Sequence, residues 1–262
     1  MRVALVTGAG RGIGAAIVRR LADDGYRVIA LDWCAGDDGV SSPGLYPQAT
    51  KAELESVAAP YDGRVVTHAG DVREPAALDA AVAGAVRLWG RLDVAVAAAA
   101  VIAGGRPLWE TAPADLDLLW EIDAKGVWNT AAAAMPAMLA GPDPSGCRFV
   151  AIASAAGSHG LFGLSAYNAA KHAVVGIVRG LAADLVGTGV TAVAVSPGST
   201  ATPMLDQTAR LHDVTTADLA QHQLIRRVIE PAEIAATVAL CCSREGAVLN
   251  GSVVHADGGF TP

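Results

Sequence analysis

The feature that most constrains the fold is a glycine-rich turn between an apolar run and a helical pattern near the N-terminus. The run Arg2–Thr7 (RVALVT) is followed directly by GAGRGIG. Glycine permits a tight turn and a close backbone approach, and the helix behind it presents free N–H groups and its positive dipole end. This arrangement predicts an anion-binding strand–turn–helix unit, whose binding residues are Gly8, Gly10, Arg11, Gly12, Ile13 and Gly14.

Strand-like and helical patterns alternate along the rest of the chain. The expected strands are Arg2–Thr7, Arg27–Asp32, Val65–Ala69, Val94–Ala98, Arg148–Ala153, Val190–Val195 and Ser252–His255. The expected helices are Ile13–Asp24, Pro75–Trp89, Ala112–Leu139, Ala166–Leu185 and Pro231–Cys242. Alternation of this kind predicts one α/β domain over residues 1–262, a Rossmann-like, doubly wound sheet of about seven parallel strands with helices on both faces.

Two longer segments interrupt this rhythm. Residues 34–50 are rich in Gly, Ser and Pro, and residues 199–227 are polar with patches of helical pattern. Long connections in a compact domain are usually functional. We expect the first segment to cover a cofactor and the second to form a lid over a substrate.

Composition and charge exclude several functions. The net charge is −7 and no basic run exceeds two residues, which argues against nucleic acid as a partner. The apolar runs are too short for a membrane span, and the N-terminal run lacks a cleavage site and is interpreted as the first strand. The four cysteines show no CxxC spacing and the six histidines no metal-ligand spacing. A reduced, cytoplasmic protein without a metal site is the expectation.

An acidic residue closes the second expected strand and bears on the choice of cofactor. Asp32 can accept hydrogen bonds from the ribose hydroxyls of a dinucleotide and would repel a 2′-phosphate, which favours NAD over NADP. Arg11 is counter-evidence, because an arginine in the glycine turn could serve a phosphate. The alternative for Asp32 is a solvated acid at a strand end.

The spacing TGxxxGxG resembles that of the short-chain dehydrogenase/reductase family. Further stretches extend the resemblance over nearly the whole chain: Gly70-Asp71-Val72, Ser196-Pro197-Gly198 and Asp257-Gly258-Gly259. The resemblance implies further cofactor contacts at Asp71, Val72, Ala98, Ala99, Pro197, Gly198, Thr200 and Thr202.

Three residues in the second half of the chain resemble the catalytic trio of that family. Tyr167 and Lys171 are four residues apart and share a helix face, and Ser154 precedes the tyrosine by thirteen residues. A nearby ammonium and a cationic nicotinamide both favour the phenolate, so Tyr167 is the expected base, or the acid in the reverse reaction. Lys171 would lower the pKa of the tyrosine and hold the cofactor ribose, and Ser154 would orient the substrate oxygen. The alternative is a tyrosine and a lysine on a solvated helix surface.

Two departures from the family pattern matter. The family's Asn-Asn-Ala-Gly after the fourth strand is replaced by Ala97–Ala100, and its catalytic asparagine is replaced by Asp123. In the family, the main-chain carbonyl of that asparagine is thought to hold a water in the proton path, so the path can persist while the new carboxylate changes its pH dependence. We expect a negative φ at Ala100, with the glycines of VIAGG supplying the freedom.

The expected substrate residues are Val101, His159, Phe162 and Met204, with Ile102 and Leu161 beside them. This apolar rim favours a hydrophobic secondary alcohol or its ketone, although His159 could equally be an ordinary loop histidine. Trp109, Trp120 and Trp128 are expected in the core or at an interface. The family resemblance implies a homotetramer.

Several stretches resemble the mycofactocin-associated branch of the family more closely, among them VIAGGRPLWET, the insertion with Tyr46-Pro47, and SVVHADGGF. That resemblance implies an NAD held without ready exchange and the peptide-derived carrier mycofactocin as external electron acceptor. Two alternatives stay open: a conventional NAD(P)H-dependent carbonyl reductase, and a dinucleotide-binding sensor without turnover.

Overall fold

The computed structural model of the chain describes residues 1–36 and 46–261. Seven strands form one sheet in the order β3-β2-β1-β4-β5-β6-β7, and every pair is parallel. The strands are β1 Val3–Thr7, β2 Arg27–Asp32, β3 Val65–Ala69, β4 Val94–Ala97, β5 Arg148–Ile152, β6 Thr191–Pro197 and β7 Val253–Ala256. The predicted doubly wound sheet is confirmed, and the strand ends differ from expectation by two residues at most.

Helices connect the strands and cover the sheet. They are α1 Gly12–Asp23, α2 Lys51–Ala58, α3 Pro75–Trp89, α4 Pro113–Leu119, α5 Lys125–Leu139, α6 Ser165–Asp184, α7 Pro203–His212, α8 Thr216–Ala220 and α9 Pro231–Cys242. Short 3-10 turns lie at Ala59–Tyr61, Leu108–Glu110, Pro144–Gly146, Ala155–Gly157 and Glu245–Leu249. A π-helical turn, Trp120–Ala124, joins α4 to α5.

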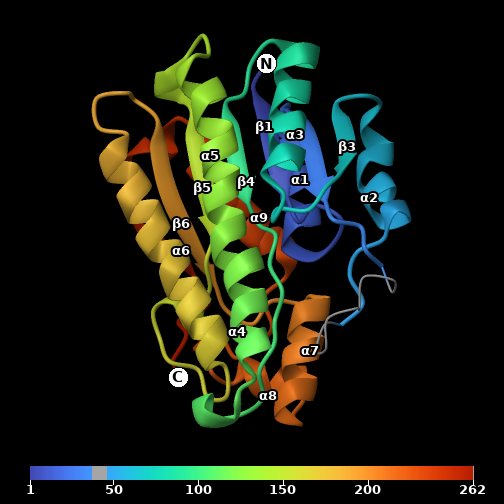
Figure 1. Cartoon of the computed structure of the whole chain (residues 1–262), viewed down its shortest axis with the longest axis vertical. Helices are drawn as coiled ribbons and strands as arrows, with labels where there is room; N and C mark the ends of the chain where they lie inside the picture. The colour runs from blue at the N-terminus through green and yellow to red at the C-terminus, as the bar shows by residue number, and fades with distance from the viewer. Residues whose placement is uncertain (37–45, 262) are drawn as a thin grey trace.

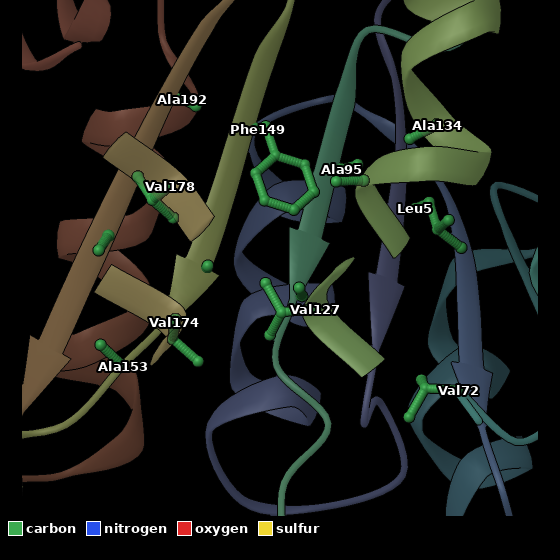
Figure 2. Close-up of a cluster of buried hydrophobic side chains, with 14 of the residues drawn as sticks. Leu5, Val72, Ala95, Val127, Ala134, Phe149, Ala153, Val174, Val178 and Ala192 are labelled. Atoms are coloured by element: carbon green, nitrogen blue, oxygen red, sulfur yellow. The ribbon is translucent and has the colours of Figure 1, made fainter. Parts of the chain in front are cut away.

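The sheet separates two apolar layers (Figure 1). On one face, α3, α5 and α6 pack against the strands, and Figure 2 shows Phe149 and Ala95 of this layer side by side on neighbouring strands, with Val127 of α5 in the same cluster. On the other face, α1, α2 and α9 contribute to a second cluster. Because helices cover both faces of the sheet, the strand sequences are nearly continuous runs of apolar residues.

The prediction of one regular helix over Ala112–Leu139 is wrong. It contains the turn Trp120–Ala124, where the N–H of Lys125 donates to the carbonyl of Trp120, five residues back. Such π-turns insert one extra residue and rotate the side chains that follow. Apolar periodicity continues on either side, so the sequence pattern did not reveal the interruption.

The two long segments end at the carboxyl edge of the sheet. Of the insertion at 34–50, residues 37–45 lie outside the described residues, while Gly36 donates to the carbonyl of Ala49 on the returning limb. Residues 199–227 contain α7 and α8, which lie beyond the strand ends (Figure 1). Among the described residues, the helices are all too short or too polar to span a bilayer.

The alanine run after β4 adopts the backbone that we predicted. Ala100 does not have a positive φ, whereas Gly104 and Gly105 have φ of 145° and 93°. The N–H of Gly105 donates to the carbonyl of Gly163 at 2.8 Å, and a Cβ on Gly104 would lie 2.7 Å from that same oxygen. The two glycines therefore let this loop lie against the loop before α6.

Candidate active site

The strand order reverses between β1 and β4, and the crevice expected at such a switch point lies where both strands end. Gly8 follows β1 with φ of 66°, and a Cβ there would lie 2.7 Å from the Cα of Ala99. The hydroxyl oxygen of Thr7 accepts from the N–H of Ala98 at 3.1 Å and of Ala99 at 3.3 Å. The alanine run is thus packed against the glycine turn through its backbone, and larger side chains would narrow this crevice.

The glycine turn and the first residues of α1 line this crevice. A Cβ on Gly14 would lie 2.0 Å from the carbonyl oxygen of Gly8, so α1 begins in direct contact with the turn. Within the described part of the chain, no side chain caps the start of α1 at Arg11. An uncapped helix start beside glycines suits a diphosphate.

Asp32 closes β2 beside the same turn, as expected. One carboxylate oxygen accepts from the N–H of Gly10 at 2.9 Å and the other from the N–H of Cys34 at 3.1 Å. These bonds fix the carboxylate at the edge of the crevice and leave further lone pairs for ligand hydroxyls. Burial and the charge of Asp32 together raise the pKa of the Cys34 thiol to about 11.

A second wall of this end of the crevice follows β3. Asp71 forms an ion pair with Arg73, whose guanidinium lies 4.7 Å from the ring centroid of Trp33. The carbonyl of Val72 accepts from the side-chain amide of Asn129 at 2.9 Å. The asparagine therefore supports the Asp71-Val72 turn from α5.

A contact that we did not expect closes the crevice over the glycine turn. Tyr46 is buried and lines the cavity, and the guanidinium of Arg11 lies 5.5 Å from its ring centroid. Arg11 also donates to the carbonyl of Pro47. The sequence placed Tyr46 only within an insertion of unknown path, so nothing local indicated that it folds back onto Arg11.

The predicted catalytic trio converges at the other end of the cavity. Tyr167 and Lys171 occupy adjacent turns of α6, and Ser154 follows β5, where its hydroxyl accepts from the N–H of Ala156 at 3.2 Å. The hydroxyl of Tyr167 lies 3.9 Å from the sulfur of Met204. Burial raises the pKa of Tyr167, while the charge of Lys171 and a hydrogen bond with Ser154 lower it. The alternative of a tyrosine and a lysine on a solvated surface is therefore wrong.

Asp123 lies directly behind this trio. Its carboxylate is fully buried, with one oxygen 3.2 Å from the Nζ of Lys171 and the other accepting from the N–H of Val101 at 2.9 Å. The family resemblance implied a role for the main-chain carbonyl at this position, whereas the structure also brings the side chain of Asp123 into contact with the lysine.

The end of the cavity beside Tyr167 has an apolar lining. Val101 and Met204 line the cavity, together with Leu161, Leu164 and Phe260, and their contact with a substrate stays a prediction. His159 and Phe162 do not line the cavity. Phe162 is 84% exposed, and the centroid of its ring lies 6.4 Å from that of the His212 ring. A substrate contact by either residue stays a prediction.

The C-terminal tail completes this end of the cavity. The N–H groups of Leu224 and Ile225 donate to the carbonyls of Gly259 and Gly258, so the tail pairs with the chain that leaves α8. This pairing holds Phe260 against the cavity. The sequence indicated an Asp-Gly-Gly turn here but gave no signal for the aromatic residue behind it.

One cavity of about 240 Å³ connects these parts. Besides the trio, the predicted site residues that line it are Gly8, Arg11, Gly12, Ile13, Gly14, Asp32, Asp71, Val72, Ala98, Ala99, Val101, Pro197, Gly198, Thr200, Thr202 and Met204. Gly10 and Asp123 lie just behind its wall. Residues from both halves of the chain thus form a single elongated site.

Comparison with known proteins identifies the family. Residues 8–261 match the family described as enoyl-(acyl carrier protein) reductase. The chain belongs to the short-chain dehydrogenase/reductase family. It is 36% identical over 261 residues to the short-chain reductase protein NovJ of Streptomyces niveus, an alignment that covers 98% of this chain and 93% of that protein.

Two further relatives agree with this assignment. An uncharacterised NAD-dependent oxidoreductase of Mycobacterium tuberculosis (strain CDC 1551) is 38% identical over 214 residues, 80% of this chain and 75% of that protein. The crystal structure of carveol dehydrogenase from Mycobacterium avium with NAD superposes with a TM-score of 0.89 at 31% identity, covering 98% of this chain and 96% of that one. The chain is therefore an oxidoreductase of this family.

Proposed function

We propose that this oxidoreductase transfers a hydride between NAD and a hydrophobic secondary alcohol or its ketone. The observation that carries the proposal is the single cavity that joins the glycine turn of β1 to the hydroxyl of Tyr167. NAD in the name of the mycobacterial oxidoreductase and in the carveol dehydrogenase structure supports the cofactor.

The residues of the crevice fit NAD. The glycine turn is a cradle that a Cβ at Gly8 or Gly14 would fill, and the uncapped start of α1 suits the diphosphate. The fixed carboxylate of Asp32 suits unphosphorylated ribose hydroxyls. When bound, NAD supplies the nicotinamide that accepts or returns the hydride.

The side chains at the other end supply the proton chemistry. As the phenolate, Tyr167 takes the proton of the alcohol in oxidation, and as the phenol it returns that proton to the carbonyl oxygen in reduction. The hydroxyl of Ser154 orients the substrate oxygen and stabilises the charge that develops on it. The ammonium of Lys171, 5.5 Å from the tyrosine ring centroid, favours the phenolate.

The apolar lining around Met204, Leu164 and Phe260 supports a hydrophobic substrate. A polar substrate would lose hydration there without recovering hydrogen bonds, which costs free energy. The carveol dehydrogenase of Mycobacterium avium, named for an alcohol, is consistent with this substrate class.

We further propose that NAD is retained between turnovers and that mycofactocin accepts the electrons. The contact of Arg11 with Tyr46 and Pro47 supports retention, because it joins the glycine turn to the segment before α2. We propose that this contact opens before NAD leaves.

Single-turnover kinetics test the proposal. Candidate alcohols should reduce the bound NAD of the purified protein once, and the Tyr167→Phe variant should slow this step at least a hundredfold, in the range typical of lost acid–base catalysis. Undiminished turnover in that variant would exclude the mechanism.

Mass spectrometry of the denatured protein tests the retention of NAD, and it should find NAD in the supernatant. Protein that purifies without NAD and turns over repeatedly with free NAD would refute retention and indicate a conventional reductase.

We also propose a homotetramer. Trp120, Trp128 and Leu116 remain exposed on the α4–α5 unit, and Trp128 keeps 62% of its surface. Several large apolar side chains on one unit favour association with another protein surface. Light scattering should give four times the chain mass, and Trp128→Glu should lower it.

A further inference from the structure

The carboxylate of Asp123 is buried and unusually placed for a charged group. Its Oδ1 accepts from the N–H of Val101 at 2.9 Å, and its Oδ2 lies 3.2 Å from the Nζ of Lys171. Among the described residues, no group donates to Oδ2 in hydrogen-bonding geometry. Because a buried carboxylate is costly unless it is paired, the ammonium of Lys171 is the charge that balances it.

The π-turn explains how Asp123 reaches this position. The N–H of Lys125 donates to the carbonyl of Trp120 instead of to that of Glu121, so the helix widens by one residue at this point. The turn packs against α6, which carries Lys171. A regular helix through the same residues would rotate the side chain at 123 relative to α6.

Lys171 is held from two sides. Its Nζ donates to the carbonyl of Ile152 at 3.3 Å and faces Asp123 at 3.2 Å, and its side chain is almost fully buried. The carbonyl of Ile152 uses one of the three donors of the ammonium, so donors remain for the cavity. The position of the ammonium is set by these two protein contacts.

Asp123 also acts on Tyr167 through Lys171. Burial raises the pKa of Tyr167 most, the charge of Lys171 lowers it, and the charge of Asp123 raises it. Asp123 likewise helps to raise the pKa of Lys171, against the effect of burial. Burial raises the pKa of Asp123 itself, whereas the charge of Lys171 and the hydrogen bond from Val101 lower it. In its ionised form, Asp123 favours the charged ammonium and offsets the effect of that ammonium on the phenol.

The other titratable groups around this cluster come from separate elements. Ser154, after β5, forms a hydrogen bond that lowers the pKa of Tyr167. Tyr46 faces the cluster from the insertion, with Arg11 over its ring. On the π-turn itself, Glu121 is half-buried and pairs with Lys125 of α5.

We propose that Asp123 is a positioning residue that fixes Lys171 by a buried ion pair and offsets the pull of the ammonium on the hydroxyl proton of Tyr167. The proposal rests on the acid–base role of Tyr167 given above. It implies that Tyr167 keeps its proton to higher pH than it would beside a neutral residue at 123. The protonated phenol is the form that donates to a carbonyl oxygen.

The test compares Asp123→Asn, which keeps the side-chain shape, with Asp123→Glu, which keeps the charge. Ultraviolet difference titration of each variant against its own Tyr167→Phe counterpart isolates the ionisation of Tyr167 without substrate or turnover. We expect Asp123→Asn to lower the midpoint by about one pH unit, within the range for a neighbouring charge. Asp123→Glu should retain most of the wild-type value. The pH profile of single-turnover alcohol oxidation should move in the same direction.

A midpoint in Asp123→Asn that is unchanged or raised would overturn the proposal. A lowered midpoint without any alcohol turnover would instead refute the proposed function and leave the ion pair supported. If Asp123→Asn does not fold, isotope-edited infrared titration of the wild-type carboxyl groups decides. If the buried carboxyl of Asp123 is ionised at neutral pH, its ion pair with Lys171 is supported. If that carboxyl is protonated at neutral pH, the proposal is overturned.

Discussion

The hydroxyl oxygen of Thr7 accepts a hydrogen bond of 3.1 Å from the backbone N–H of Ala98, across the point where the strand order reverses. This bond holds the end of β1 beside the end of β4, and the glycine turn and the alanine run meet there. Alanine methyl groups take no part in it. The polar contact comes from the backbone, so the absence of polar side chains at 97–100 is compatible with a binding crevice.

Gly8→Ala should weaken NAD binding in this crevice in addition to the loss of stability that alanine causes at a positive φ. Gly25→Ala is the matched control, because Gly25 has φ of 87° and a Cβ there would meet no atom within 4 Å, whereas Gly8 has φ of 66° and a Cβ there would lie 2.7 Å from Ala99. Both variants should lose about 1–2 kcal/mol of unfolding free energy for left-handed alanine. Only Gly8→Ala should also weaken NAD binding, measured by calorimetry, and equal binding by the two variants would contradict the close-packed turn.

Arg11→Ala should speed the release of NAD. Loss of the contacts with Tyr46 and Pro47 removes about 1–2 kcal/mol, which corresponds to about tenfold in rate. Arg64→Ala is the control, since Arg64 lies 5.7 Å from the Tyr61 ring centroid, in a pair that does not line the cavity. Stopped-flow displacement of NAD measures both rates, and equal rates would exclude a retaining role for Arg11.

Met204→Ala and Phe162→Ala should separate two of the residues that the sequence grouped as substrate contacts. Met204 lies 3.9 Å from the hydroxyl of Tyr167, whereas Phe162 is exposed. We expect Met204→Ala to raise KM for hydrophobic alcohols about tenfold, the effect of about 1.4 kcal/mol of lost contact. Phe162→Ala should leave KM unchanged, and a raised KM there would restore Phe162 to the substrate site.

Stability in alkali should depend on Tyr167. Burial raises its pKa above the ordinary value of 10.0, so its contribution to stability is fully present below that pH and is lost as the pH rises through the folded-state pKa. The Tyr167→Phe variant lacks the hydroxyl that ionises at alkaline pH, so this loss of stability is absent from it. Urea unfolding at a series of pH values above about 9 should show a shallower decline for Tyr167→Phe than for the wild type, and parallel declines would contradict the direction of the shift.

The sequence was informative wherever a local pattern decides the structure. Strand ends follow from apolar runs, and the negative φ of Ala100 followed from the steric cost of a methyl group. The trio of Ser154, Tyr167 and Lys171 was predicted from its resemblance to the family, and the structure places all three on one cavity. Helix α2 was missed, although Thr50 and Glu53 form a capping box that marks its start. Contacts made over long sequence separations were not predictable: the pairing of Asp123 with Lys171 depends on a π-turn, and that of Arg11 with Tyr46 depends on the return path of the insertion.

The pairing of the tail with the chain after α8 has a practical consequence for handling the protein. Thr261 donates its N–H to the carbonyl of His222 at 2.7 Å, and Phe260 beside it lines the substrate cavity. A purification tag fused behind these residues would begin next to Phe260, and so would place added chain beside the wall of the cavity. Met1 is exposed and lies at the opposite end of the molecule (Figure 1), so an N-terminal tag places the added chain away from Phe260 during substrate screening.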